Sequence, residues 1–278
     1  MLKKNSALER HAVNIRGCGD DVLVFSHGYG CDQSIWNLVL PMLGSVARTV
    51  VYDLTGAGAS DISHFDPKHR HSELAGYAAD LIEICDELNA SRLTFVGHSV
   101  SAIIGLIAAS LRPDLFVSLV LIAPSPCYQN TDDYDGGFET EQLEDLLELM
   151  SDNFSNWADI VSPIIMGNPH RPELAKELSN SFCRWNEDIA KHFARLTFLS
   201  DSREILTHVR NDCLIMQCSN DLIAPDFVGD YMSKRLAVSK LVRLKAQGHC
   251  PHVSNPQETA TVISEFLQHR GKQMPHGA

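Results

Sequence analysis

The chain has 278 residues, of which 44% are hydrophobic and 21% charged, so it can form one large core and its composition is that of an ordinary globular protein. The formal net charge of −12 argues against a nucleic-acid partner, because binding to phosphates requires a clustered basic face. No stretch approaches the roughly 20 apolar residues of a membrane span, and the N-terminus lacks the apolar core of a signal peptide. We therefore expect a cytoplasmic protein that acts on an uncharged or apolar small molecule, without a membrane or nucleic-acid partner.

The cysteines indicate a reducing compartment. Most of the 8 lie in apolar runs, and they lack the C-x-x-C or paired spacing of a zinc ribbon or a disulfide framework. We expect buried thiols. Two of them, Cys213 and Cys218, share one predicted strand, and their odd separation should place them on opposite faces of the sheet.

Near-continuous apolar runs of strand length alternate with helical patterns in the first part of the chain. Such runs are typical of strands that are buried on both faces of a parallel sheet. Apolar residues at helical spacing extend from Leu74 to Leu88, and the next helix, Val100–Leu111, is almost wholly apolar and so should be buried. The predicted strands are Asp21–Ser26, Thr49–Asp53, Arg92–Val96 and Ser118–Ile122.

The alternation stops between about residues 132 and 199, where no convincing strand occurs. We interpret this segment as a helical cap, because four amphipathic helical stretches follow one another: Glu141–Met150, Asn153–Val161, Pro172–Arg184 and Asp188–Leu199. Most of their apolar residues should only pack, and a minority should line a pocket between cap and core. The apolar stripes include Leu143, Leu146, Leu147, Phe154, Trp157, Leu174, Leu178, Phe182, Phe193 and Phe198.

Strand and helix patterns return after residue 199. Strands are expected at Cys213–Cys218 and Leu241–Leu244, and a closing helix at Thr259–Gln268. This alternation indicates a doubly wound α/β fold with a mostly parallel central sheet. We predict a core formed by residues 1–131 and 200–278, with residues 132–199 as an inserted four-helix lid.

A short stretch at the end of the third predicted strand carries the chemistry. Gly97-His-Ser-Val-Ser101 places Ser99 between a β-branched apolar run and a long apolar helix. In a nucleophile elbow the central serine takes strained backbone angles that lift its hydroxyl above the sheet. The generic G-x-S-x-G pattern is met except at its last position, where Ser101 replaces glycine.

Two further polar residues, Asp221 and His249, each follow the end of a later predicted strand. In a parallel sheet these ends share one edge with Ser99, and the order Ser, Asp, His is that of α/β-hydrolases. We assign Ser99 as nucleophile, His249 as general base and then acid, and Asp221 as the carboxylate that orients His249. The expected oxyanion hole consists of the backbone N–H groups of Val100 and Tyr29.

Each of the three residues assigned to the triad has a plainer interpretation when it is considered alone. Ser99 could be a helix cap, Asp221 a turn residue and His249 a loop histidine; their joint placement at three strand ends favours the triad. His249, Cys250 and His252 lie close together in the sequence, but further ligands at metal spacing are missing. We therefore expect no metal and no cofactor. Dehalogenase or epoxide hydrolase chemistry would need a carboxylate in place of Ser99.

Several segments carry a family resemblance. They are the elbow Gly-His-Ser-Val-Ser-Ala, the loop His27-Gly-Tyr-Gly-Cys-Asp-Gln-Ser-Ile-Trp36, Ser125-Pro-Cys-Tyr128 followed by Gly136-Gly-Phe-Glu139, and Gly248-His-Cys-Pro-His252. Together they resemble the RsbQ group of α/β-hydrolases, a bacterial stress-response group related to the plant karrikin and strigolactone receptors. The resemblance extends from about residue 8 to residue 268, and Ser101 in the elbow belongs to the pattern of this branch.

The resemblance implies a V-shaped lid of four helices over a deep apolar pocket, a weak hydrolase activity and a signalling role. It also implies a possible partner, a PAS-domain phosphatase. Tyr29 stands where the family commonly has phenylalanine. At matching positions the pocket would be lined by Tyr29, Tyr128, Phe138, Trp157, Phe198 and Leu222.

Two functions are compatible with these residues. The first is a serine hydrolase that cleaves an ester or lactone of a small apolar molecule through an acyl-enzyme, within stress or signal regulation. The second is a ligand sensor that hydrolyses slowly or once and signals through a protein partner. Both use the same pocket and the same triad, so the residues alone do not choose between them.

Overall fold

The computed structural model describes residues 6–18, 21–43, 47–90 and 92–273. Strands within these ranges form one sheet in the order β1-β3-β2-β4-β5-β6-β7. β1 pairs antiparallel with β3, and every other pair is parallel, which confirms the predicted mostly parallel sheet. The strands are β1 (Asn14–Arg16), β2 (Val22–Ser26), β3 (Arg48–Tyr52), β4 (Leu93–His98), β5 (Phe116–Ile122), β6 (Asp212–Ser219) and β7 (Ser239–Gln247).

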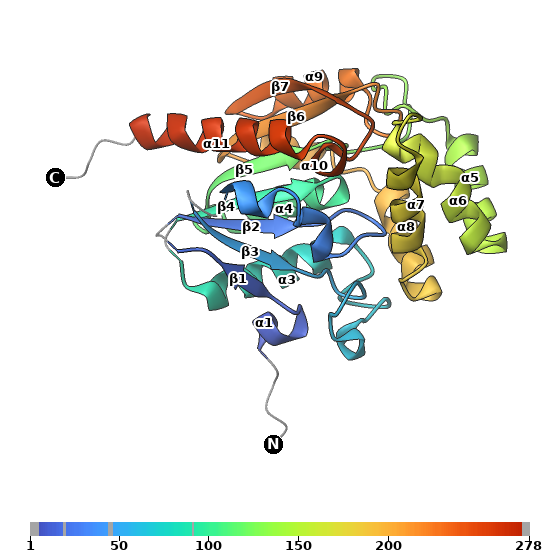
Figure 1. Ribbon diagram of the computed structural model, residues 1–278, viewed down its shortest axis with the longest axis horizontal. Coiled ribbons are helices and arrows are strands. Elements are labelled where there is room, and N and C mark those ends of the chain that lie inside the picture. Colours follow the sequence, from blue (N-terminus) through green and yellow to red (C-terminus); the bar gives the residue numbers. More distant parts are fainter. Residues whose placement is uncertain (1–5, 19–20, 44–46, 91, 274–278) are drawn as a thin grey trace.

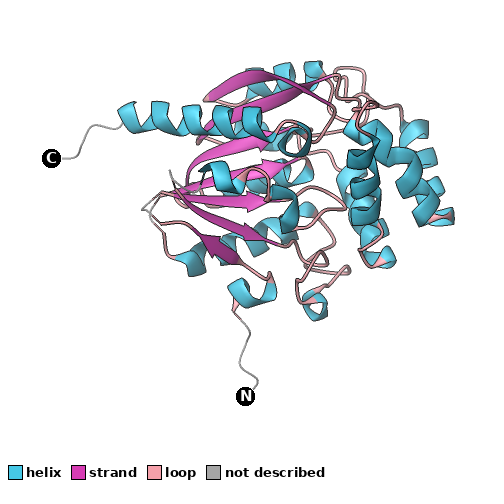
Figure 2. Cartoon of the chain, viewed as in Figure 1, coloured by secondary structure: helices cyan, strands magenta, loops and turns pink. Residues whose placement is uncertain are grey.

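Helices cover both faces of this sheet (Figure 2). α3 (Leu74–Leu88), α4 (Val100–Leu111) and α9 (Asp226–Arg235) contribute to the core on one face, and α2 (Leu40–Leu43) and α11 (Pro256–Gln273) to the core on the other. In the described ranges, none of the helices has the length and apolar character needed to cross a membrane. The remaining short helices are α1 (Ala7–Arg10), η1 (Gln33–Trp36), η2 (Ile62–His64), η3 (Glu204–Thr207) and α10 (Pro251–Ser254).

The burial of each strand explains whether it could be predicted from the sequence. Every residue of β2 and β4 is buried, and each strand contains a run of apolar residues that strand prediction can use. All three residues of β1 are exposed, and it therefore lacks the apolar run on which strand prediction depends. For this reason β1 was not among the predicted strands.

The segment between β5 and β6 contains four helices, at the place where the cap was predicted. Figure 1 shows them grouped beyond the ends of the strands to which the arrowheads point. We call them the helical insertion: α5 (Thr140–Asp152), α6 (Phe154–Met166), α7 (Pro172–Phe182) and α8 (Glu187–Leu199). The predicted boundary failed most clearly in α6, which continues through Pro163; proline removes one backbone donor but here does not end the helix.

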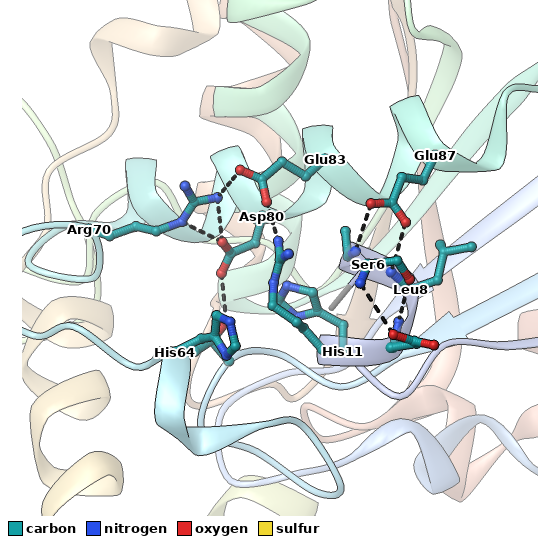
Figure 3. A network of polar contacts seen from close by, with 12 residues as sticks. Ser6, Leu8, His11, His64, Arg70, Asp80, Glu83 and Glu87 are labelled. Carbon is teal, nitrogen blue, oxygen red and sulfur yellow. Dashed lines mark hydrogen bonds and ion pairs between the residues drawn. The ribbon is translucent and has the colours of Figure 1, made fainter. Parts of the chain in front are cut away.

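Asp80 of α3 is the centre of a buried polar network, part of which is drawn in Figure 3. It accepts hydrogen bonds from Thr55 Oγ1 (2.6 Å), His71 Nε2 (2.9 Å) and Arg70 Nε (2.7 Å). Burial alone would raise the pKa of Asp80, but the hydrogen bonds from His71 and Thr55 and the nearby His11 and His71 imidazoles hold it at about 2. The carbonyl of His71 accepts a hydrogen bond of 2.7 Å from His192 Nε2 in α8, so the network also joins the core to the helical insertion.

The cysteines follow the prediction in part. All 8 are free thiols, and Cys18 and Cys183 are exposed while the other six are buried. The expectation of burial was therefore wrong for these two, which lie in a loop after β1 and at the end of α7. Cys213 and Cys218 belong to the cores on opposite faces of the sheet, as their spacing predicted.

Candidate active site

Ser99 lies in the tight turn between β4 and α4. Its backbone angles of φ 56° and ψ −124° are unfavourable for an L-residue and must be held by the surrounding structure. The Ser99 N–H donates to the carbonyl of Ile122 in β5, and the Ala102 N–H donates to the carbonyl of Ser99, both at 2.9 Å. A Cβ at Gly97 would lie 2.7 Å from the Ala102 nitrogen, so the turn requires glycine there.

Ser101 occupies the elbow position that is usually glycine. Its hydroxyl donates a hydrogen bond to the carbonyl of His27 and accepts one of 2.8 Å from Ser26 Oγ. Ser26 ends β2, and His27 begins the loop that contains Tyr29. Ser101 therefore connects the elbow to this loop.

Ser99, His249 and Asp221 form one buried hydrogen-bonded row. Ser99 Oγ is 2.8 Å from His249 Nε2, and His249 Nδ1 is 2.8 Å from Asp221 Oδ2. Because an ionised carboxylate can only accept, Nδ1 of His249 carries the proton and Nε2 can accept the proton of Ser99. The second oxygen of Asp221 accepts the N–H groups of Ile223 (2.8 Å) and Ala224 (3.0 Å).

The main chain of His249 is fixed from two sides. His98 Nε2 donates to the carbonyl of His249 at 2.9 Å, and the His249 N–H donates to the carbonyl of Ile165 in α6 at 2.8 Å. Burial and the neighbouring His252 and His249 imidazoles hold the pKa of His98 well below its usual value, so His98 is neutral with Nε2 as its donor. The helical insertion thus helps to position His249.

The loop after β2 lies against the elbow. A Cβ at Gly28 would be 3.3 Å from Ser99 Cβ, and the carbonyl of Gly28 accepts a hydrogen bond of 2.9 Å from His27 Nδ1. In a trans peptide the C=O and the following N–H point in opposite directions, so this bond directs the Tyr29 N–H away from the His27 ring. Val100 is the first residue of α4, where N–H groups lack an intrahelical acceptor.

The end of α7 and the turn after it hold the rest of this loop. Ser181 Oγ donates to the carbonyl of Gly30 at 2.8 Å, and Trp185 Nε1 donates to the carbonyl of Cys31 at 3.0 Å. The ring of Phe182 lies over Gly30, where a Cβ would approach it within 1.8 Å; the φ of +72° at Gly30 also favours glycine. The predicted oxyanion loop is therefore bonded to the helical insertion.

A cavity of about 30 Å³ lies beside Ser99, which is roughly the space of one or two water molecules. It is much smaller than the deep pocket that the resemblance implied, because aromatic rings fill the space: Tyr29 lies 5.5 Å from Phe182 and 6.2 Å from Phe198 between ring centroids. The cavity is lined by Tyr29, Cys31, His98, Ser99, Tyr128, Ile165, Leu178, Phe182, Thr197, Phe198, Ile223, His249 and Cys250.

Two predicted pocket residues lie in a second layer behind this lining. The ring centroid of Phe138 is 6.4 Å from that of Tyr128, and the ring centroid of Trp157 is 6.1 Å from that of Tyr29. Both support lining residues without reaching the cavity. The pocket assignment of Phe138 and Trp157 is therefore corrected, whereas Tyr29, Tyr128 and Phe198 do line the cavity.

Leu222 was also predicted to line the pocket, and this was wrong because 64% of it is exposed. Asp221 Oδ1 binds the N–H groups of Ile223 and Ala224, which bends the chain tightly after the carboxylate. In this turn Ile223 lines the cavity and Leu222 is exposed to solvent. A resemblance at one position does not reveal which side of a turn faces inward.

Several other residues that line the cavity were not predicted as site residues. Leu178 and Phe182 were recognised as part of an apolar helical stripe, but spacing does not separate pocket positions from packing positions. Cys31 and Cys250 carried one usable signal, since each lies within two residues of a predicted site residue, Tyr29 or His249.

Few polar groups face the cavity. The hydroxyl of Tyr128 lies 3.5 Å from Ser99 Oγ, and burial raises the pKa of Tyr128 to about 12, so it is a neutral hydrogen-bond donor. Thr197 Oγ1 donates to the carbonyl of Phe193 in its own helix (2.8 Å). Among the described residues, no group of three or more His, Cys, Asp or Glu side chains could hold a metal ion.

Comparison with known proteins gives the family. The model of the Alpha/beta hydrolase family matches residues 23–262. The chain is 38% identical to the karrikin insensitive 2 receptor CA of Petunia hybrida, over 94% of this chain and 97% of that protein. It is 36% identical to the strigolactone esterase D14 of Arabidopsis thaliana, over 96% and 99%. A solved structure of a hydrolase from Oleispira antarctica matches with a TM-score of 0.92 and 39% identity, over 94% and 96% of the two chains. The chain belongs to the alpha/beta hydrolase family.

Proposed function

We propose that the protein is a serine hydrolase that cleaves an ester or lactone of a small apolar molecule through an acyl-enzyme. The observation that carries the proposal is the buried row of Ser99, His249 and Asp221 with its two contacts of 2.8 Å. The plainer role of Ser99 as a helix cap is disfavoured, because its side chain makes no capping hydrogen bond to α4. A relative that is a strigolactone esterase supports ester chemistry.

The first half of the reaction forms the acyl-enzyme. His249 Nε2 takes the proton of Ser99 while Ser99 Oγ attacks the carbonyl carbon of the substrate, and Asp221 stabilises the imidazolium that results. The carbonyl oxygen becomes negative and accepts hydrogen bonds from the Tyr29 and Val100 N–H groups. The bond to the leaving oxygen then breaks, and His249 gives that oxygen the proton.

The second half releases the acid. Water attacks the acyl carbon, His249 takes a proton from the water, and Ser99 leaves with the proton returned by His249. With a lactone the leaving oxygen stays attached to the acyl group, so the product is a single hydroxy acid. Asp221 Oδ2 faces His249 Nδ1 and Asp221 Oδ1 accepts two backbone N–H groups, so the carboxylate is held in place as the orienting partner of His249.

The side chains that line the cavity beside Ser99 indicate the class of substrate. Apolar side chains surround Ser99, and Tyr128 offers one neutral donor hydroxyl near the reacting oxygen. Buried apolar walls disfavour a charged substrate, since a charge would lose its hydration without a partner. We place the chain in the RsbQ-like branch on the motifs around Ser101 and Tyr128, and its relatives named for karrikin and strigolactone support a small ligand.

Multi-turnover hydrolysis of p-nitrophenyl acetate tests this function. Ser99→Ala should remove the activity, and His249→Ala should lower the rate about 10²–10⁴-fold, as expected for a lost general base. Ser110→Ala is the matched control, because Ser110 lies in α4, the helix that follows Ser99, and its hydroxyl donates to the carbonyl of Ile107. Equal rates in the wild type and in Ser99→Ala would refute the assignment.

A specific observation favours a second candidate, a ligand sensor with slow or single turnover. The cavity holds about 30 Å³, so any ligand larger than water must displace part of its lining, which includes residues of the helical insertion. Ligand occupancy would then change the outer surface of the insertion, the lid of the sequence prediction. The relative that is a karrikin insensitive 2 receptor supports this role.

Two measurements separate the candidates. A burst of one equivalent of product per protein, followed by a much slower rate, supports the sensor, and steady turnover supports the hydrolase. In the sensor, a bound ligand should also change the melting temperature and the capture of a signalling partner. A PAS-domain phosphatase, the partner implied by the resemblance to the RsbQ group, is the protein to use in that capture. Capture that does not depend on ligand would contradict the sensor.

A further inference from the structure

The cavity beside Ser99 is too small for the reaction that the site would perform. Its volume of about 30 Å³ compares with about 300–1,000 Å³ for pockets that enclose small-molecule ligands. A substrate must therefore move at least one wall. The wall that moves at the lowest cost is one with empty space behind it, because a side chain that moves into a void displaces no packed neighbour.

Most walls of the cavity are held firmly. The imidazole of His249 is fixed by hydrogen bonds on both of its nitrogens. The rings of Tyr128 and Phe198 lie 5.3 Å apart between centroids, and Tyr29 contacts four further aromatic rings of the helical insertion and of the turn after α7. Displacement of these groups would disrupt hydrogen bonds or a continuous aromatic cluster.

Leu178 of α7 is different. It lines the cavity beside Ser99 and also lines a second pocket of about 160 Å³ on another side of α7. Its side chain has no polar atom that could hold it by a hydrogen bond. Leu178 is the residue that the two linings share, so a change in its position connects them.

The second pocket, which we call the α7 pocket, has apolar walls and a charged rim. Leu178, Ile35, Met166, Leu174 and Val253 are among its walls. The rim carries an ion pair between Arg184 and Asp32, with 3.5 Å from Arg184 Nη2 to Asp32 Oδ2. Leu38, also in its lining, is 53% exposed, so the pocket opens to solvent.

We propose that the α7 pocket is the second part of the substrate site and receives an unbranched apolar arm of the ester or lactone, with Leu178 as the side chain that moves aside. This proposal rests on the proposed function and adds a subsite to it. The apolar walls select hydrocarbon, and each methylene that enters should improve the specificity constant about fourfold. The solvent-open mouth lets the far end of a longer arm reach water at the Arg184 rim.

The test compares ester chain lengths in wild type and in a variant with the α7 pocket filled. Leu174→Trp replaces an aliphatic side chain with a bulky indole in the α7 pocket, and Leu174 does not line the cavity beside Ser99. Leu149→Trp is the matched control, since Leu149 is 36% exposed on α5 and lines neither space. The substrates are p-nitrophenyl acetate, p-nitrophenyl octanoate and octyl acetate, which carry a short arm, a long acyl arm and a long alcohol arm.

Ethyl acetate serves as the short-chain reference for octyl acetate. In wild type, either the kcat/KM of p-nitrophenyl octanoate should be more than tenfold above that of p-nitrophenyl acetate, or that of octyl acetate should be more than tenfold above that of ethyl acetate. Leu174→Trp should remove that advantage, whereas the control Leu149→Trp should keep it. Leu178→Ala, which joins the two spaces, should increase the advantage. If Leu174→Trp changed kcat/KM by the same factor for all substrates, or for none of them, the proposal would be overturned.

A binding experiment keeps this proposal separate from the hydrolase assignment. In the Ser99→Ala background, 1-octanol should raise the melting temperature of the protein. The rise should be lost on adding Leu174→Trp and kept on adding Leu149→Trp. An equal rise in all three proteins would overturn the subsite even if hydrolysis is observed, and loss only with Leu174→Trp would support it even if hydrolysis is absent.

Discussion

The indole Nε1 of Trp185 donates a hydrogen bond of 3.0 Å to the carbonyl of Cys31. Trp185 follows α7 of the helical insertion, and Cys31 lies two residues after Tyr29 in the proposed oxyanion loop. On the other side of the site, the carbonyl of Ile165 in α6 accepts the N–H of His249. The helical insertion therefore contacts both loops on which the proposed chemistry depends, so its position affects the reaction as well as access to the site.

The first prediction concerns Trp185. Trp185→Phe keeps an aromatic ring but removes the donor to Cys31, so the oxyanion loop loses one restraint. We expect kcat for p-nitrophenyl acetate to fall about tenfold, less than the 10²–10³ typical of a deleted oxyanion donor, with a smaller change in KM. Trp36→Phe is the control, because Trp36 is buried and its Nε1 has no hydrogen-bond partner among the described residues. Equal losses in both variants would mean that packing alone is responsible.

The second prediction concerns His98, which we regard as a positioning residue for His249. His98→Gln can still donate to the His249 carbonyl, whereas His98→Leu cannot and leaves that carbonyl without its buried donor. We expect His98→Leu to lower kcat more than tenfold and His98→Gln to retain most of it. Steady-state kinetics would measure the difference in kcat between the two variants, and melting temperatures measured in parallel would show whether both are folded. Similar rates for the two variants would contradict a role for the hydrogen bond.

Ser101 gives the third prediction. Ser101→Ala removes the bond to the His27 carbonyl and the acceptor of Ser26 Oγ. We expect the free energy of unfolding to fall by about 1–3 kcal/mol, the cost of buried polar groups left without partners. Urea unfolding measures this change. Ser125→Ala provides a comparison, since Ser125 is also buried but bonds the carbonyl of Cys127, outside the elbow.

The fourth prediction concerns acid stability. His252 is fully buried between Trp36 and His98, at centroid distances of 4.6 and 4.4 Å, and burial lowers its pKa to about 3. The unfolded chain binds a proton at His252 near pH 6.5, but the folded protein does not bind it until about pH 3. The folded state therefore has its full free energy of unfolding, as far as His252 is concerned, above pH 6.5. This free energy decreases as the pH falls toward 3.

At pH 5 this single group should cost the folded state about 2 kcal/mol relative to pH 7. His252→Phe keeps the aromatic packing and removes the titration, so its free energy of unfolding should depend less on pH by that amount. Urea unfolding at pH 7 and at pH 5 measures the difference. An identical pH dependence in wild type and His252→Phe would show that His252 is not protonated on unfolding.

Much of the site was accessible from the sequence for a physical reason. Ser99, Asp221 and His249 each follow a strand with a clear apolar run, and the ends of parallel strands share one edge of the sheet. The bond between Trp185 and Cys31 joins residues 154 positions apart, and no periodicity encodes such a contact. Which of Leu222 and Ile223 faces the cavity likewise depends on a turn, and hydrogen bonds to Asp221 fix the geometry of that turn.

The central claim is that Ser99 is a nucleophile activated by His249, and covalent labelling tests it most directly. Phenylmethylsulfonyl fluoride should add one sulfonyl group per wild-type chain, and peptide mass spectrometry should locate it on Ser99. His249→Ala should slow the labelling strongly, and Ser99→Ala should abolish it. An adduct on another residue, or no adduct on the folded wild-type protein, would contradict the account.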